Sequence, residues 1–95
     1  MPSNWKAYAG LTLVNADTEY SQALSSDVKF IAIKSRSAMS DLKISFVSGE
    51  SGTNFTTIFG GAEWRNPEKL QTPNSETIYV QSSQAGTVVE IEEWR

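Results

Sequence analysis

Apolar and polar residues alternate over several short segments of the chain, a period that is typical of β-strands with one buried face. The clearest case is LKISFVS, in which Leu42, Ile44 and Phe46 are separated by Lys, Ser and Val. The segment TIYVQS repeats this alternation around Ile78 and Val80. Both segments predict strands with an apolar inner face.

Other segments complete an all-β pattern. VKFIAIKSRS (residues 28–37) is apolar on both faces in its middle, which predicts a central strand. WKAYAGLTLV (residues 5–14) alternates at Leu11 and Leu13, and Gly10 predicts a bend or bulge. YSQAL, FTTIF and AEWR are shorter candidates, and no segment carries two turns of helical spacing.

Turn residues divide these segments. GESGTN predicts a hairpin between the strand of Phe46 and FTTIF, and SQAG predicts a last hairpin that joins TIYVQ to TVVEIEEW. NPEKLQTPNSE, with two prolines, predicts an irregular loop. The expected fold is all-β, with about eight short antiparallel strands in a β-sandwich or jelly roll. We expect residues 1–95 to form a single β-sandwich domain, with residues 1–9 as a possible N-terminal arm.

The last predicted strand has two dissimilar faces. Val89 and Ile91 share one face, whereas Glu90, Glu92 and Trp94 share the other with a valine. The first pair is expected in the core. For the second set, one interpretation is a solvated strand at the sheet edge, where charge discourages unwanted pairing. The alternative is a stripe that binds a partner.

Composition narrows the possible functions. Ninety-five residues suit one domain with a modest core. The absence of Cys and His removes disulfides, thiolate metal sites and the commonest general base, so we expect no metal and no cofactor. A net charge of −3 disfavours nucleic acid as a partner. We expect no signal peptide at the N-terminus, and the longest apolar stretch, FIAI, predicts no membrane span.

Candidate catalytic groups are few. Glu90 and Glu92 would lie on one strand face about 7 Å apart, a separation also found in acid–base catalysis, but no cleft is predicted beside them. Ser40 and Lys43 have the spacing of a Ser-x-x-Lys pair at a turn, which we interpret as coincidence. A calcium site formed by Asp17 and Glu19 would have too few oxygen ligands. We therefore expect no enzyme.

Large aromatic residues are frequent for so small a domain: Trp5, Tyr8, Trp64, Tyr79 and Trp94. One interpretation is packing in the core and at sheet edges. Another is that the rings near the chain ends anchor a protein interface, where Trp is enriched. A third is stacking on sugars. Basic residues concentrate in the first half and acidic ones toward the end, an asymmetry able to orient head-to-tail contacts.

The pieces ISFVSG, TIYV and AGTVVEIEEW, which lie in residues 44–94, resemble small virion proteins of tailed bacteriophages. The resemblance implies a capsid decoration or cement protein, made in the host cytoplasm and carried on the outer surface of an icosahedral head. It implies the major capsid protein as partner, a homotrimeric unit and stabilised contacts between capsomers. From side-chain chemistry alone, the interface candidates are Trp5, Tyr8, Glu90, Glu92 and Trp94. The alternative function is a carbohydrate- or receptor-binding module of a fibre or tail, which predicts Trp64 or Tyr79 exposed on a concave face.

Overall fold

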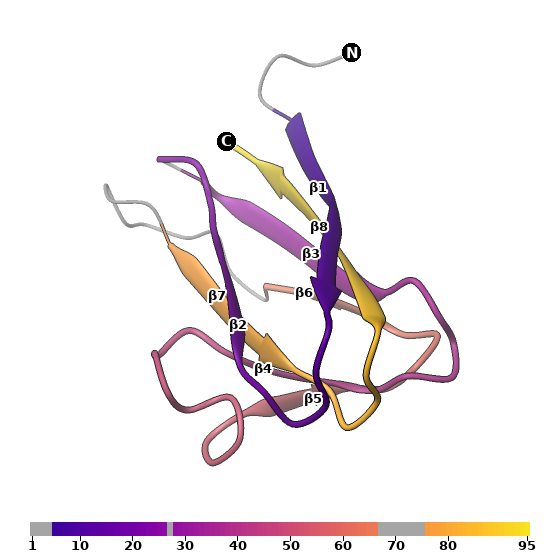
Figure 1. Ribbon diagram of the computed structural model, residues 1–95. Coiled ribbons are helices and arrows are strands. Elements are labelled where there is room, and N and C mark those ends of the chain that lie inside the picture. The colour runs from indigo at the N-terminus through magenta and orange to yellow at the C-terminus, as the bar shows by residue number, and fades with distance from the viewer. Residues whose placement is uncertain (1–4, 27, 67–75) are drawn as a thin grey trace.

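Eight strands, and no helix, make up the part of the chain that the computed structural model describes, which is residues 5–26, 28–66 and 76–95. The strands are β1 (Trp5–Leu13), β2 (Tyr20–Ala23), β3 (Phe30–Ser35), β4 (Leu42–Ser45), β5 (Thr56–Ile58), β6 (Glu63–Arg65), β7 (Thr77–Gln81) and β8 (Thr87–Trp94). They build two four-stranded antiparallel sheets (Figure 1). The predicted all-β class is confirmed.

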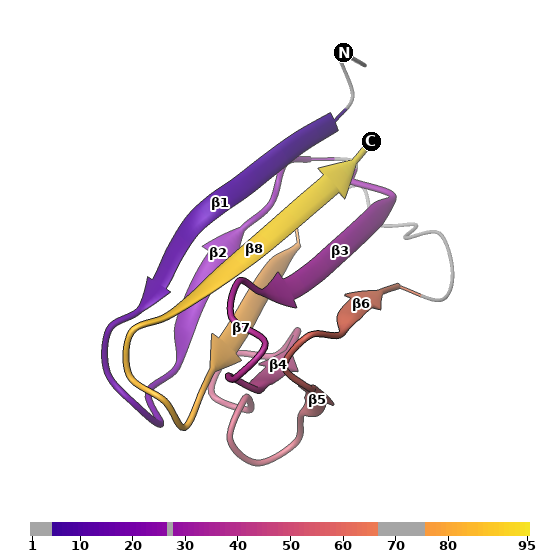
Figure 2. The same ribbon diagram turned by 90° about the vertical axis from the view of Figure 1, so that its right-hand side faces the viewer.

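The strand order defines the architecture. One sheet has the order β1-β8-β3-β6, and the other has the order β2-β7-β4-β5. The first strand thus pairs with the last, the second with the seventh, the third with the sixth and the fourth with the fifth. This is the connectivity of an eight-stranded jelly roll. Figure 2 shows β1, β8, β3 and β6 side by side in one layer, with the second sheet behind.

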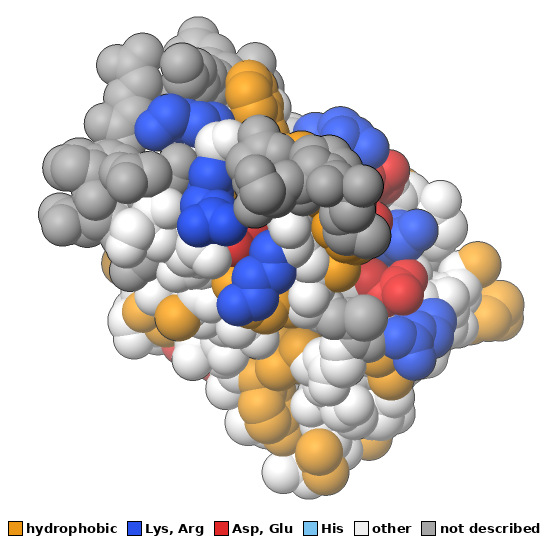
Figure 3. Space-filling model, turned by 90° about the horizontal axis from the view of Figure 1, so that it is seen from above, with side chains coloured by type: hydrophobic (Ala, Val, Ile, Leu, Met, Phe, Trp, Pro, Cys, Tyr) orange, Lys and Arg blue, Asp and Glu red, His pale blue; other side chains and the backbone are white. Residues whose placement is uncertain are grey.

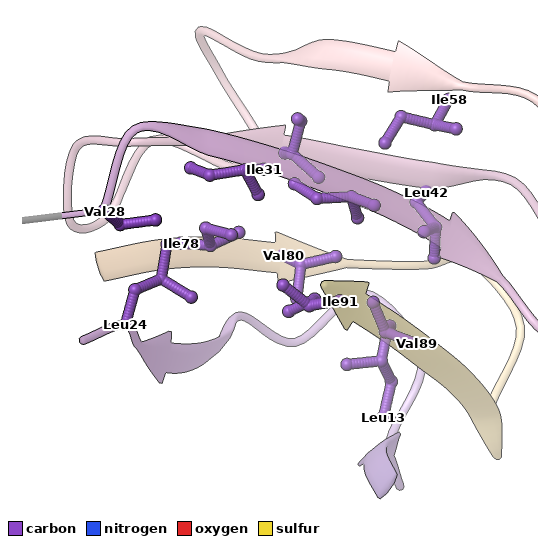
Figure 4. Close-up of a cluster of buried hydrophobic side chains, with 12 residues drawn as sticks. Leu13, Leu24, Val28, Ile31, Leu42, Ile58, Ile78, Val80, Val89 and Ile91 are labelled. Atoms are coloured by element: carbon purple, nitrogen blue, oxygen red, sulfur yellow. The ribbon is translucent and has the colours of Figure 1, made fainter. Parts of the chain in front are cut away.

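The core between the sheets is aliphatic (Figure 4). Its buried members come from both sheets and from the segments that lead into them: Leu13, Leu24, Val28, Ile31, Ile33, Leu42, Ile44, Ile58, Ile78, Val80, Val89 and Ile91. None of the three Trp, three Tyr and four Phe is fully buried. Packing in the centre of the core therefore does not account for the aromatic residues, and only Tyr8, Tyr20 and Trp64 pack against its margin.

The alternation predicted the inner faces of β7 and β8 correctly, but Phe46, expected on the inner face with Leu42 and Ile44, is 37% exposed because β4 ends at Ser45. Ile78 and Val80 on β7, and Val89 and Ile91 on β8, are completely buried. Strand β3 is central, as predicted, between β8 and β6. The pairing of β1 with β8 shifts register between Tyr8 and Leu11, which confirms an irregularity at the predicted position.

Two expectations about the last strand are wrong. Strand β8 is not an edge strand, because β1 flanks it on one side and β3 on the other. It also does not form a hairpin with β7, because the two strands belong to different sheets. The loop between them crosses from one sheet to the other, where the Gly86 amide donates to the Leu13 carbonyl and the Asp17 amide to the Ser82 carbonyl. The predicted hairpin of β4 and β5 is present.

Serine hydroxyls stabilise several strand ends, which gives the Ser-rich composition a structural role. Ser35 at the end of β3 and Ser45 at the end of β4 each accept a hydrogen bond from the amide two residues further on. Ser82, which follows β7, accepts one in the same way. Such local bonds satisfy backbone groups where the sheet pairing stops.

Residues 5–9 of the possible N-terminal arm belong to β1, and residues 1–4 lie outside the described part. Residues 67–75 of the predicted irregular loop also lie outside it. No helix in the described ranges has the length and apolar character needed to span a bilayer.

Candidate functional site

The outer face of the β1-β8-β3-β6 sheet brings together four of the five interface candidates. Residues paired directly across neighbouring strands point to the same face of a sheet. Trp94 on β8 pairs with Trp5 on β1 and with Phe30 on β3. The three rings therefore form one row across three strands, which we call the aromatic row. Phe30, 47% exposed, was missed by the sequence analysis, because only the pairing of β3 with β8 places it there.

The next row toward the middle of the sheet contains Glu92. Its pairing partners are Ala7 on β1 and Ala32 on β3, and Arg65 on β6 pairs with Ala32. The indole Nε1 of Trp5 donates to Oε2 of Glu92 at 3.4 Å. The carboxylate of Glu92 thus lies beside the aromatic row with an alanine on each side.

Glu90 occupies the following row, in an ionic cluster. Its carboxylate lies 4.0 Å from Nζ of Lys34 and 3.5 Å from the guanidinium of Arg36. The acidic end of the chain therefore lies against part of its basic first half, because β8 pairs with β3. The charge asymmetry along the sequence is partly cancelled in space, so it gives little support for head-to-tail contacts. Figure 3 shows basic and acidic side chains interspersed along one side of the molecule.

Arg65 connects this ionic pattern to the aromatic row. Its guanidinium is 2.9 Å from Oε1 of Glu63, and its Cζ lies 5.6 Å from the ring centroid of Trp94. An indole face attracts cations electrostatically. The chain thus places one of its own cations on one ring of the aromatic row.

Tyr8 does not belong to this surface. It lies on the inner face of β1, packed against the core, and its hydroxyl donates to Oε1 of Glu93 at 3.2 Å. Glu93 has no exposed surface and also accepts hydrogen bonds from the amide and the hydroxyl of Ser25. No role for Glu93 was predicted, although the alternation in β8, extended by one position, puts this residue on the face of Ile91.

Trp64 and Tyr79, the residues expected for a sugar-binding face, lie apart from each other. Trp64 packs against the core, with its ring centroid 5.8 Å from that of Phe46. Tyr79 is on the other sheet, where it pairs with Ser21 and Ser45. The structure therefore does not bring these two rings to one face.

Two depressions beside Arg36 have volumes of about 300 and 310 Å³. One lies against the loop that leads into β8, and the other lies between β3 and β6. Their linings are polar or small and contain no aromatic ring, and Glu90 faces the second with Lys34. Neither depression offers the apolar enclosure that is typical of small-molecule sites.

Among the described residues, no three acidic side chains lie close enough together to hold a metal ion. Glu19, considered for calcium, instead accepts hydrogen bonds from the amides of Gly49 and Ser51 and from the Ser51 hydroxyl, at 2.6–3.0 Å. The Ser51 hydroxyl, aided by the two amides and opposed by burial, lowers the pKa of Glu19 below its ordinary value. This carboxylate therefore holds the loop between β4 and β5 in place.

Fold and surface together define a jelly-roll domain that carries the aromatic row on one outer sheet face. Comparison with protein-family models, curated proteins and solved structures gave no match.

Proposed function

We propose that this chain is a non-enzymatic structural protein of a virion. In this proposal it is a decoration or cement protein that binds the outer surface of an icosahedral phage head and stabilises contacts between capsomers. The resemblance of residues 44–94 to small phage virion proteins supplies the biological context. The aromatic row supplies the contact surface.

The observation that carries the proposal is the position of Trp5, Trp94 and Phe30 outside an aliphatic core. The two sheets pack through aliphatic side chains, so these rings are not needed to fill the interior. Aromatic residues are enriched in the buried centres of protein interfaces, where they contribute much of the binding energy. A row of three on one sheet face fits a docking surface for another protein.

In the proposed mechanism each copy adds a small contact across a seam of the shell. Many copies repeat that contact by symmetry, so that weak individual affinities sum to a large stabilisation. The major capsid protein is the proposed partner and a homotrimer the proposed unit. No step of this mechanism requires a catalytic group.

The test compares phage heads that carry the protein with heads assembled without it. Heads without the protein are expected to rupture at a lower temperature or on transfer to low salt. Heads that carry the Phe30→Ser variant are compared in the same assay. Phe30 is 47% exposed, so this substitution should leave the fold intact and weaken attachment to the head. Equal survival of both kinds of heads would contradict the proposal.

A second candidate is a carbohydrate-binding module. The observation in its favour is the carboxylate of Glu92 beside the Trp5 indole, since sugar sites combine aromatic rings with a few placed polar groups. The isolated domain would then bind a glycan array, and the signal would fall on Glu92→Gln. A blank array with the folded protein would eliminate this candidate.

A further inference from the structure

Glu92 has a different electrostatic environment from its neighbours on the outer sheet face. Glu90 pairs with Lys34 and Arg36, and Glu63 pairs with Arg65. Within the described residues, the only side-chain contact that Glu92 makes with a donor is the neutral indole of Trp5. Among residues 5–26, 28–66 and 76–95, no cation is therefore paired with this carboxylate.

The surroundings of Glu92 leave room for a cation from outside. On the β1 side its row neighbour is Ala7, which is exposed and carries no atom beyond Cβ. Trp5 lies in the neighbouring row, and its indole Nε1 donates a hydrogen bond of 3.4 Å to the carboxylate of Glu92. Trp5, Ala7 and Glu92 thus lie side by side on the outer face, with the smallest side chain beside the carboxylate, and we call the surface of these three residues the Glu92 notch.

On the other side of Glu92, a cation of the chain already lies against an indole ring and a carboxylate. There Arg65 lies over the ring of Trp94, with Cζ 5.6 Å from the centroid, and pairs with a carboxylate. A guanidinium between an indole and a carboxylate is thus already present on this face. The Glu92 notch has the same two components, an indole and a carboxylate, without the cation.

We propose that the Glu92 notch receives a lysine or arginine side chain of the partner protein. The ammonium or guanidinium group pairs with the carboxylate of Glu92, and the aliphatic stem lies over Ala7 against the Trp5 indole. This inference rests on the proposed function, because it names the partner chemistry for the same surface. Charge complementarity selects this occupant, since the carboxylate and the indole both attract a cation.

The first experiment uses the isolated protein and small probes. Nα-acetyl-lysine methylamide and Nα-acetyl-arginine methylamide carry the cation, and Nα-acetyl-norleucine methylamide is the neutral control with a similar stem. The Trp5 indole N–H signal in the ¹⁵N-labelled protein is expected to shift with both cations and not with norleucine. Glu92→Gln, which keeps an oxygen acceptor for Trp5, should weaken the response about two- to fivefold.

Glu50→Gln is the matched control variant, because it makes the same change in net charge in the loop between β4 and β5, on the other sheet. It should respond as the unmodified protein does. No shift of the Trp5 signal with either cation, or equal shifts in the Glu92→Gln variant, would overturn the inference. A response to methyl glucoside that falls on Glu92→Gln, with no response to either cation, would also overturn it and favour the sugar-binding alternative.

The second experiment separates this inference from the proposed function. Purified heads lacking the protein are mixed with the unmodified protein, with Glu92→Gln and with Glu50→Gln, and bound protein is measured by sedimentation. Weakened binding of Glu92→Gln alone supports the inference. Equal binding of all three overturns it and leaves the proposed function standing. If the unmodified protein fails to bind, the proposed function falls, and the probe titration alone decides whether the notch binds cations.

Discussion

The hydroxyl of Tyr8 on β1 donates a hydrogen bond of 3.2 Å to Oε1 of Glu93 on β8. Both residues lie on the inner side of their sheet, and Glu93 is completely buried. The amide of Ser25 donates to the other carboxyl oxygen at 2.9 Å. A single carboxyl group therefore joins the first strand, the last strand and the segment that follows β2. Burying such a group is tolerable because each of its oxygens accepts a hydrogen bond.

Replacing Tyr8 with Phe should destabilise the protein by about 1 kcal/mol, because the buried Glu93 loses a donor while the ring remains. Urea unfolding at neutral pH measures the change. Tyr79→Phe is the control, since no hydrogen bond of the Tyr79 hydroxyl is found among the described residues. Equal effects of the two substitutions would show that the Tyr8–Glu93 bond contributes nothing specific.

Glu93→Gln should cost about 1–3 kcal/mol, because an amide NH₂ would meet donors that now point at carboxyl oxygens. Glu90→Gln on the same strand breaks only partly exposed ion pairs and should cost about 1 kcal/mol or less. Thermal unfolding of both variants compares the two positions. A loss at Glu90 as large as at Glu93 would contradict the assigned burial.

Gly60→Ala should be destabilising by about 1–3 kcal/mol through overpacking. A Cβ at this position would lie 2.2 Å from the carbonyl oxygen of Ala38, so the loops before β4 and before β6 would have to separate. Gly10→Ala is the control, because a Cβ there meets no atom within 4 Å. Chemical denaturation should find Gly10→Ala within about 0.5 kcal/mol of the unmodified protein. A small loss of stability in the Gly60→Ala variant would mean that the two loops separate easily.

The ionisation of Glu19 should make the free energy of unfolding depend on pH. Its pKa in the folded protein lies below the ordinary value of 4.5, chiefly because of the Ser51 hydroxyl. A group with a lowered folded pKa stabilises the protein above its unfolded pKa, and this contribution is lost as pH falls through the folded pKa. Glu19→Gln should therefore be destabilising at pH 7, and the difference from the unmodified protein should shrink below about pH 4.5.

Unfolding curves at a series of pH values test this prediction, with Glu50→Gln as the control for net charge. A stability difference between Glu19→Gln and the unmodified protein that stays constant down to strongly acidic pH would contradict the role of the Glu19 carboxylate. A difference that grows as the pH falls would reverse the predicted sign.

The sequence predicted the positions of some residues of the candidate site but not of others. The two-residue period placed Glu90, Glu92 and Trp94 on one face of the last strand, and the structure agrees. It could not show whether this strand lies at the edge or in the middle of a sheet, because alternation describes only the two sides of a strand and not its neighbours. Strict alternation from Leu11 and Leu13 would put Trp5 on the inner face and Tyr8 on the outer face. Because the register of β1 shifts between Tyr8 and Leu11, the two residues lie on the opposite faces instead.

The sequence by itself determined the all-β class, most strand positions and the inward side chains of β7 and β8, because alternation and turn chemistry are local properties. Only the tertiary structure decided which strands lie side by side. Backbone pairing between distant segments depends on how the two apolar faces close over one core, and no single segment contains that information. For this reason the aromatic row, the Glu92 notch and the hydrogen bond between Tyr8 and Glu93 follow only from the pairing of distant strands.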